Sequence, residues 1–335
     1  MFKTPSFWYS QKTPKERTAK LLLLPLSWVY GFLAKKRFDL YFPVPMEKPI
    51  VCVGNLVAGG TGKTPVVLSL VEMLKKEEFN PHVLSRGYGG EEIGPLQVSP
   101  GRDTAQDVGD EPLLLVQKAP TWISSDRPLG AQAAMESGAN IVVMDDGFQN
   151  PIIYKDFSII VIDGAVGFGN QELMPAGPLR EPISSGLKRA NAVVIIGEDK
   201  TNVIAQIEEE HANVEILRAN IEVCKNCIEV KDKKFVAFAG LGRPEKFKNT
   251  LLKQGADVIE WRSFPDHHYY KDEELEELIK IAEDNNVQII TTAKDHIRLP
   301  EKFKDKISQL PIVLVWENPE AIIPLIKEAI DKRPK

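Results

Sequence analysis

Residues 49–64 read PIVCVGNLVAGGTGKT, and residues 65–76 continue as PVVLSLVEMLKK. The first stretch begins with a short apolar run that is typical of a buried strand, and the second repeats apolar residues at helical spacing. A strand, a glycine-rich loop and a helix in this order are the setting of a phosphate-binding loop, whose backbone amides surround phosphate oxygens. We therefore predict a nucleotide-phosphate site formed by Gly59, Gly60, Thr61, Gly62, Lys63 and Thr64.

Within this loop, we expect Lys63 to reach the β- and γ-phosphates and the Thr64 hydroxyl to bind magnesium. The spacing departs from the GxxxxGK[ST] pattern at one position. Val57 stands where the first glycine is expected, and the nearest upstream glycine is Gly54. The GGTGKT core is complete and stands in the required setting, so we keep the prediction.

Two later stretches carry charges suited to the same site. Residues 141–149, IVVMDDGFQ, indicate a buried parallel strand that ends in Asp145 and Asp146. Carboxylates at the carboxyl end of such a strand, beside a phosphate loop, are where magnesium is held. Residues 177–182, GPLREP, place Arg180 in a loop where its guanidinium could bind phosphate oxygens. Taken alone, however, this arginine is better explained as a surface residue.

The length of 335 residues suggests two domains. From residue 49 onward, short apolar strands alternate with helices, which predicts an α/β fold with a doubly wound parallel sheet and ligands at the strand carboxyl ends. We place the phosphate-loop domain at residues 46–215 and a connector at 216–230. A second, smaller α/β domain at 231–335 would contribute His267 to a cleft opposite Lys63.

The first 40 residues hold eight Lys and Arg against two acidic residues, a charge of +6, so the rest carries −11 of the total of −5. The acidic remainder argues against a nucleic-acid partner. Between Lys20 and Lys35 runs LLLLPLSWVYGFLA, which is shorter than the ~20 residues that span a bilayer. We interpret residues 1–45 as a membrane-associated segment whose helix lies on an anionic surface, with Trp28, Tyr30 and Phe32 in the lipid. An ordinary buried helix is the main alternative.

Cys224 and Cys227 form a CxxC pair. No second CxxC and no matching histidine pair is present to complete four zinc ligands. We therefore expect reduced thiols without a metal.

Seven stretches, taken in order, resemble the tetraacyldisaccharide 4′-kinases, the lipid A kinases of Gram-negative bacteria. They extend over residues 50–300 and read GNLVAGGTGKTP, LSRGYGG, DVGDEPLLL, DDGFQ, GPLREP, FPDHHYY and TTAKDHIRL. Seven ordered motifs are far more specific than a phosphate loop alone. The unusual spacing before the GGTGKT core is also similar to that family.

The resemblance implies a kinase that uses ATP and Mg²⁺ to phosphorylate the 4′-hydroxyl of a tetraacylated glucosamine disaccharide 1-phosphate. It also implies attachment to the cytoplasmic face of the inner membrane, and we expect a monomer. By the same resemblance Asp110 and His267 form the catalytic pair, with Asp107 as an alternative partner for His267. Such a pair suits the chemistry, because a sugar hydroxyl must lose its proton as it attacks phosphorus. Further candidates for anionic substrate contacts are Arg86, Arg127 and Arg243.

The principal rival is a membrane-associated ATPase switch of the partitioning type, which also combines a GGTGKT loop with an amphipathic helix. That class carries a lysine directly before the two glycines, where this chain has Ala58. A switch of this type would also leave the second domain unexplained. A kinase of the same fold that acts on a soluble metabolite is less consistent with the apolar N-terminal segment.

Overall fold

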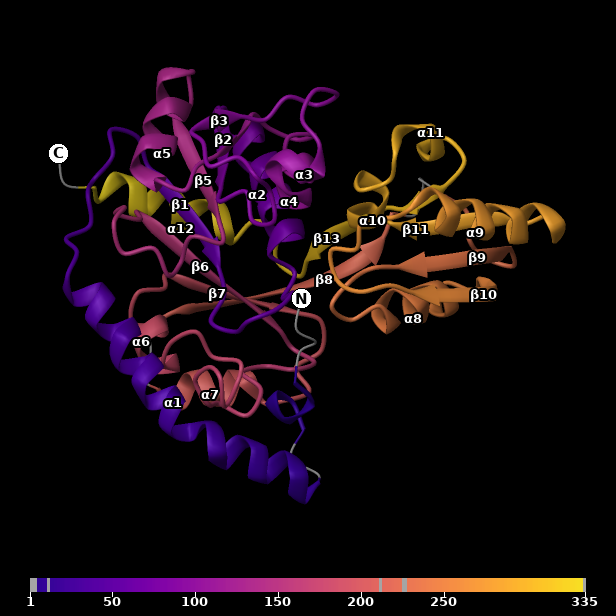
Figure 1. Ribbon diagram of the computed structural model, residues 1–335. Coiled ribbons are helices and arrows are strands. Elements are labelled where there is room, and N and C mark those ends of the chain that lie inside the picture. Colours follow the sequence, from indigo (N-terminus) through magenta and orange to yellow (C-terminus); the bar gives the residue numbers. More distant parts are fainter. Residues whose placement is uncertain (1–4, 11–12, 211–212, 225–227, 334–335) are drawn as a thin grey trace.

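The computed structural model describes residues 5–10, 13–210, 213–224 and 228–333, which form two bodies side by side (Figure 1). The larger body contains a nine-stranded sheet in the order β13-β8-β7-β6-β1-β5-β2-β4-β3. Its strands are parallel, except that β3 is antiparallel to β4 and β13 is antiparallel to β8. The strands are β1 (Ile50–Gly54), β2 (Pro81–Ser85), β3 (Leu96–Gln97), β4 (Thr121–Ile123), β5 (Ile141–Asp145), β6 (Phe157–Asp163), β7 (Ala192–Ile196), β8 (Glu215–Val223) and β13 (Ile312–Trp316).

Helices cover both faces of this sheet, as a doubly wound fold requires. One core contains apolar side chains of α2 (Lys63–Lys76) and α12 (Ile322–Asp331). The core on the other face includes side chains of α5 (Arg127–Glu136), α6 (Ile183–Leu187) and α7 (Val203–Glu209). The central strands β1, β5, β6 and β7 are buried along their whole length, which explains why they are continuous apolar runs. The predicted fold class is confirmed.

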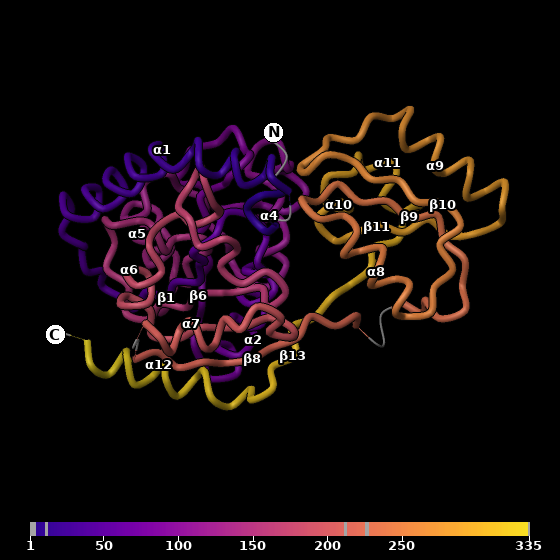
Figure 2. Tube along the Cα trace, turned by 90° about the horizontal axis from the view of Figure 1, so that it is seen from below, coloured from indigo at the N-terminus to yellow at the C-terminus, as the bar shows by residue number. Residues whose placement is uncertain are grey.

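The smaller body, seen beside the larger one in Figure 2, is a second α/β unit. Its four-stranded parallel sheet has the order β10-β9-β11-β12. Its strands are β9 (Lys234–Ala239), β10 (Asp257–Ser263), β11 (Gln288–Thr292) and β12 (Ser308–Leu310). One face packs on α8 (Glu245–Lys253), and the other packs on α9 (Asp272–Asp284) and α11 (Glu301–Lys304). The short helix α10 (Ala293–Ile297) follows β11 directly.

The predicted end of the second domain is wrong. The sequence-based prediction places all of residues 231–335 in the second domain, but β13 and α12 return to the larger body. There β13 pairs with β8, and Trp316, Ile322 and Ile326 are buried in the core beside α2. The predicted connector likewise begins inside the large sheet, because β8 pairs with β7 over residues 215–219. Pairing between strands so far apart in sequence leaves no trace in local periodicity.

The CxxC prediction also changes. Cys224 follows β8 and is disulfide-bonded, so the expectation of a reduced thiol is wrong at this position. Cys227 lies outside the described residues.

Helix α1 (Pro14–Asp39) runs along the outside of the larger body (Figure 1). It begins at a capping box formed by Thr13 and Glu16 and continues past Pro25. Large apolar side chains stand exposed along its outer side: Leu21, Leu22, Leu26, Trp28, Val29, Phe32 and Leu33. Among the described residues, no helix combines the length and apolarity needed to cross a bilayer.

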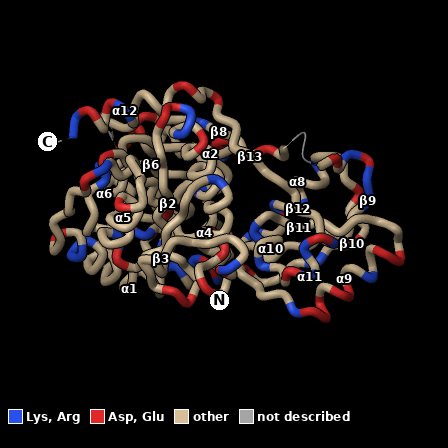
Figure 3. Tube along the Cα trace, turned by 90° about the horizontal axis from the view of Figure 1, so that it is seen from above, with Lys and Arg blue, Asp and Glu red and all other residues tan. Residues whose placement is uncertain are grey.

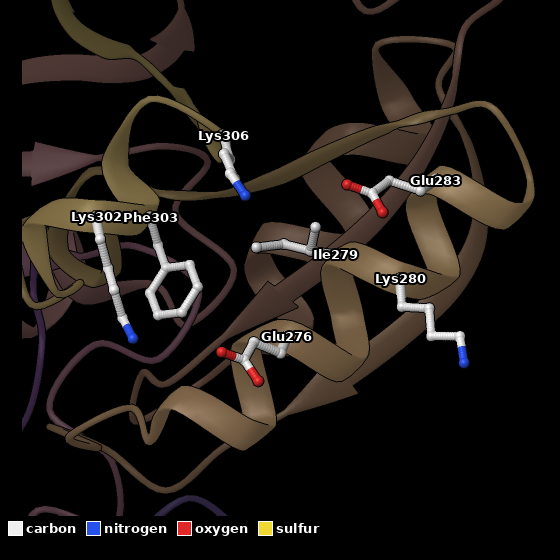
Figure 4. Close-up of a pocket in the computed structure, with 7 residues that line it drawn as sticks. All are labelled: Glu276, Ile279, Lys280, Glu283, Lys302, Phe303 and Lys306. Carbon is white, nitrogen blue, oxygen red and sulfur yellow. The ribbon is translucent and has the colours of Figure 1, made fainter.

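The outer side of the second body is polar. The helix α9 buries Leu275 and Leu278 and carries acidic residues at its exposed edge (Figure 3). A shallow pocket of about 370 Å³ lies between α9 and α11, with Ile279 and Phe303 at its centre and charged side chains around them (Figure 4). None of the predicted site residues lines this pocket.

Candidate active site

The phosphate loop connects β1 to α2 as predicted. Gly62 precedes the helix with a φ of 94°, a left-handed conformation that glycine adopts without strain. The packing also explains the departure from the usual spacing. A Cβ atom at Gly54 would lie 2.4 Å from the Cβ of Phe148, so β1 has to end in glycine. Val57 is buried and bridges to Leu179, which ties the phosphate loop to the loop that carries Arg180.

Asp145 ends β5 beside the phosphate loop, because Asp145 lies opposite Val53 of β1 in the parallel register. Its side chain is buried, and within the described part of the chain neither carboxylate oxygen has a hydrogen-bond partner. Burial, together with the negative charges of Glu111 and Asp146, raises the pKa of Asp145 to about 8. An unpaired carboxylate in this position is suited to a bound cation.

Asp146 is in a different situation, although it is the next residue. Its carboxylate accepts a hydrogen bond of 3.0 Å from Arg180 and lies 3.6 Å from Nζ of Lys63. Burial raises the pKa of Asp146, but the charges of Lys63 and Arg180 outweigh burial and lower it. The structure thus brings together the three predicted pieces of the nucleotide site. Asp146 contacts both of these cations, and its role as a second magnesium ligand stays a prediction.

Asp110 and His267 meet at the junction of the two bodies. Asp110 begins α4 (Asp110–Leu115), and His267 lies in the loop between β10 and α9. His267 Nδ1 lies 3.3 Å from Oδ2 of Asp110, whose side chain is 3% exposed. Asp107 is not the partner, because its carboxylate caps α3 (Ala105–Val108) through Thr104. The neighbouring histidine, His268, contacts Glu274 and not Asp110, with 2.8 Å between Nε2 and Oε2.

The surroundings of the pair hold it in its charged form. Burial raises the pKa of Asp110, but the adjacent His267 imidazole and the charges of Lys294 and Arg298 lower it to about 2. The contact with Asp110 in turn raises the pKa of His267 above 6.5, against the effect of burial. Asp110 is therefore ionised at neutral pH, with an imidazole fixed on one of its oxygens.

Two cations from the second body were not predicted as site residues. Lys294 Nζ lies 2.5 Å from Oε1 of Glu111, and Arg298 Nη1 lies 3.8 Å from Oδ2 of Asp110. Arg298 is buried and also contacts Asp295. Both lie in the stretch TTAKDHIRL, but nothing in their spacing indicates that they face residues 110–111 across the junction.

The three arginines proposed for anionic contacts differ in their environments. Arg86 is exposed, whereas Arg127 is buried and donates to the carbonyl of Ser124. Arg243 of the second body donates to the carbonyl of Gly60, at 3.1 Å, and pairs with Asp163. Arg243 is therefore the one of the three that contacts the phosphate loop.

The inner side of α1 contacts the loop that carries Arg180. Ser27 donates to the carbonyl of Leu173 at 2.8 Å, and the Tyr30 hydroxyl donates to the carbonyl of Arg180 at 3.1 Å. Tyr30, predicted to enter the lipid with Trp28 and Phe32, therefore points inward. The exposed apolar side of α1 and the candidate site lie on opposite sides of this contact.

The fold and the site define a two-domain phosphate-loop protein with a carboxylate–imidazole pair at the domain junction. The model of the tetraacyldisaccharide-1-P 4′-kinase family matches residues 19–331, and the chain belongs to this family.

Relatives and a solved structure agree with this assignment. The chain is 42% identical to the tetraacyldisaccharide 4′-kinase of Rhodospirillum centenum, over 96% of this chain and 94% of the relative. It is 43% identical to that of Paramagnetospirillum magneticum, over 96% and 97% of the two chains. The crystal structure of LpxK from Aquifex aeolicus in complex with ATP matches with a TM-score of 0.77 and 28% identity. That match covers 93% of this chain and 99% of the other.

Proposed function

We propose that this chain is a tetraacyldisaccharide 4′-kinase that transfers the γ-phosphate of ATP to the 4′-hydroxyl of a lipid disaccharide 1-phosphate. The observation that carries the proposal is the pairing of Asp110 in the phosphate-loop domain with His267 in the second domain. A carboxylate with an oriented imidazole beside a nucleotide-phosphate site is what a hydroxyl acceptor requires. A partitioning-type ATPase switch is not favoured, since it would give this pair no substrate to act on.

The side chains divide the work of the reaction. Lys63 lies at the start of α2, where it can bind the β-phosphate, which stays with ADP, and the γ-phosphate, which is transferred. The loop amides surround the same phosphates. Asp110 is ionised and can accept the proton that the sugar hydroxyl loses as it attacks. The His267 imidazole lies against the same carboxylate, with 3.3 Å between Nδ1 and Oδ2, and so restricts its orientation. The two domains must stay in contact for this arrangement to persist, which also excludes water from the transferring phosphate.

Magnesium fits the site at Asp145. Both oxygens of this buried carboxylate lack hydrogen-bond partners in the described residues. Burial raises the pKa of Asp145 to about 8, because the nearby positive charges do not offset it, and a bound cation would supply further positive charge. Thr64, at the first turn of α2, supplies the hydroxyl ligand that the motif predicts. When bound, magnesium neutralises charge on the β- and γ-phosphates. Among the described residues there is no group of three or more His, Cys, Asp or Glu that could hold a metal, so phosphate oxygens would complete the shell.

The lipid acceptor explains the exposed side of α1. Leu22, Leu26 and Phe32 are each more than half exposed, and basic residues stand at the end of the helix. Apolar side chains flanked by lysines favour the surface of an anionic membrane. We therefore place the protein on the cytoplasmic face of the inner membrane, where the acyl chains of the acceptor remain in the bilayer while its sugar reaches the junction.

Transfer of labelled phosphate from ATP to lipid A disaccharide 1-phosphate in mixed micelles tests the proposal. We expect Lys63→Ala to abolish labelling and His267→Ala to lower kcat by at least about 100-fold. His268→Ala is the matched control, because this neighbouring imidazole contacts Glu274 and leaves Asp110 untouched. Nucleotide hydrolysis without lipid labelling, unaffected by His267→Ala, would instead support the ATPase switch.

A further inference from the structure

Asp163 is a buried carboxylate whose ionic partners come from the other domain. It ends β6, the strand next to β1, and its side chain is 3% exposed. Nη2 of Arg243 lies 2.5 Å from Oδ2 of Asp163, and Nζ of Lys246 lies 2.6 Å from the same oxygen. Burial raises the pKa of Asp163, but the two cations outweigh burial and lower it. Asp163 therefore anchors the second domain at the edge of the phosphate loop.

Only one of the two cations also touches the phosphate loop. Arg243 donates a further hydrogen bond of 3.1 Å to the carbonyl of Gly60. The Tyr9 hydroxyl donates to the carbonyl of Ala58 at 3.3 Å. Two loop carbonyls thus receive donors from outside the loop, one from the second domain and one from the N-terminal segment.

The direction of these bonds matters for nucleotide binding. A phosphate-binding loop works by turning its backbone N–H groups inward toward the phosphate oxygens. Each peptide unit is planar, with its N–H and C=O on opposite sides, so inward N–H groups require outward carbonyls. A donor fixed at the Gly60 carbonyl consequently helps to hold the adjacent amide in the phosphate-binding orientation.

We propose that Arg243 is a positioning residue for the phosphate loop, held in place by Asp163, so that contact with the second domain prepares the nucleotide site. Arg243 acts through the backbone of Gly60 and not on the phosphates themselves. Lys246 contributes to the contact between the domains, because its ammonium group donates to Asp163 and to no loop carbonyl among the described residues. The inference rests on the proposed function, because that function identifies ATP as the nucleotide. It concerns ATP binding, which precedes phosphoryl transfer.

Arg243→Gln and Lys246→Gln form a matched pair for the test. Each removes one positive charge from the same carboxylate, at nearly the same distance, but only the first removes the donor to Gly60. We expect Arg243→Gln to weaken ATP binding, measured by calorimetry, about fivefold, and to raise KM for ATP with a smaller change in kcat. Lys246→Gln should change ATP binding less than about twofold.

Hydrogen exchange of the loop amides provides a second measurement. In the protein without nucleotide, the amides of residues 58–62 should exchange faster in Arg243→Gln and unchanged in Lys246→Gln. Equal effects of the two substitutions on ATP binding would overturn the proposal, since they would show that only charge at Asp163 matters. Unchanged ATP affinity in Arg243→Gln would overturn it as well.

Two precautions keep the test independent. If Arg243→Gln fails to fold, Arg243→Lys serves instead, because lysine keeps a positive charge for Asp163 but lacks the guanidinium fork that serves two acceptors. ATP affinity is measured without lipid, so a failure of the proposed lipid kinase activity would not be confused with a failure of this inference.

Discussion

Asp145 and Asp146 are adjacent in the chain, but replacing each with asparagine should change stability in opposite directions. The Asp145 carboxylate is buried and has no hydrogen-bond partner among the described residues, and its pKa is raised from 3.8 to about 8. The Asp146 carboxylate is bound to Arg180 and Lys63, and its pKa is lowered. In the protein without metal or nucleotide, Asp145→Asn should therefore raise thermal stability at pH 7, and Asp146→Asn should lower it.

The magnitude follows from proton linkage. At pH 7 the folded protein must hold a proton on Asp145 that the unfolded chain has released, which costs about 4 kcal/mol at 1.36 kcal/mol per pKa unit. A buried amide without partners retains about 1–3 kcal/mol of that cost. The net gain for Asp145→Asn is then about 1–3 kcal/mol, or an increase in Tm of roughly 3–10 °C for a domain of this size. Asp146→Asn should lose about 1 kcal/mol, because Lys63 and Arg180 both lose their partner.

Thermal unfolding in EDTA, followed from pH 4 to pH 8, measures both effects. A raised carboxyl pKa lowers stability as the pH rises from 3.8 toward 8, so Asp145→Asn should have no stability advantage at pH 4 and its largest advantage at pH 8. Magnesium with ATP should stabilise the wild type more than Asp145→Asn, because the cation removes the cost that the substitution also removes. A lower Tm for Asp145→Asn at pH 7 in EDTA would refute this account of the carboxylate.

The pKa of His267 is raised by Asp110, so their contact should stabilise the fold fully below pH 6.5 and less as the pH rises through the folded pKa. The stability lost in His267→Gln, from denaturant unfolding, should accordingly be greater at pH 6 than at pH 9, and a pH-independent loss would contradict the ion pair. On α1, Leu26→Glu and Phe32→Glu together should weaken binding to anionic vesicles at least about tenfold. Leu252→Glu, on a similarly exposed leucine of the second domain, is the control, and equal losses would argue against α1 as the membrane surface.

Local sequence patterns predicted the parts of the site that lie within single strand–loop–helix units. The phosphate loop and the Asp145–Asp146 strand end each occupy one short stretch, and their chemistry follows from residue type and setting. The Arg180 loop is also short, but its sequence alone favoured a surface residue. The pairing of Asp110 with His267 came from the family resemblance, because the two residues are 157 positions apart in sequence. The structure adds the contact itself and removes Asp107 as the alternative partner.

The features that sequence reasoning missed depend on contacts between distant segments. Nothing in the spacing of Lys294 and Arg298 shows that they approach Glu111 and Asp110 from the other domain. The inward direction of Tyr30 depends on where the Arg180 loop meets α1. The return of β13 to the large sheet depends in the same way on pairing with β8. Each of these is decided by packing, which local periodicity does not encode.

The pairing of β8 with β13 makes the second domain an insertion with a single point of exit and return. Val223 and Ile312 lie directly opposite each other in the antiparallel register. Directly opposed residues in such a pair are only ~5 Å apart, so a tight turn of a few residues could replace everything between them. The large sheet, its two apolar cores and α1 would be left without a gap in the chain. A lipid kinase of this architecture could thus have arisen by growth within one hairpin loop of a nucleotide-binding domain.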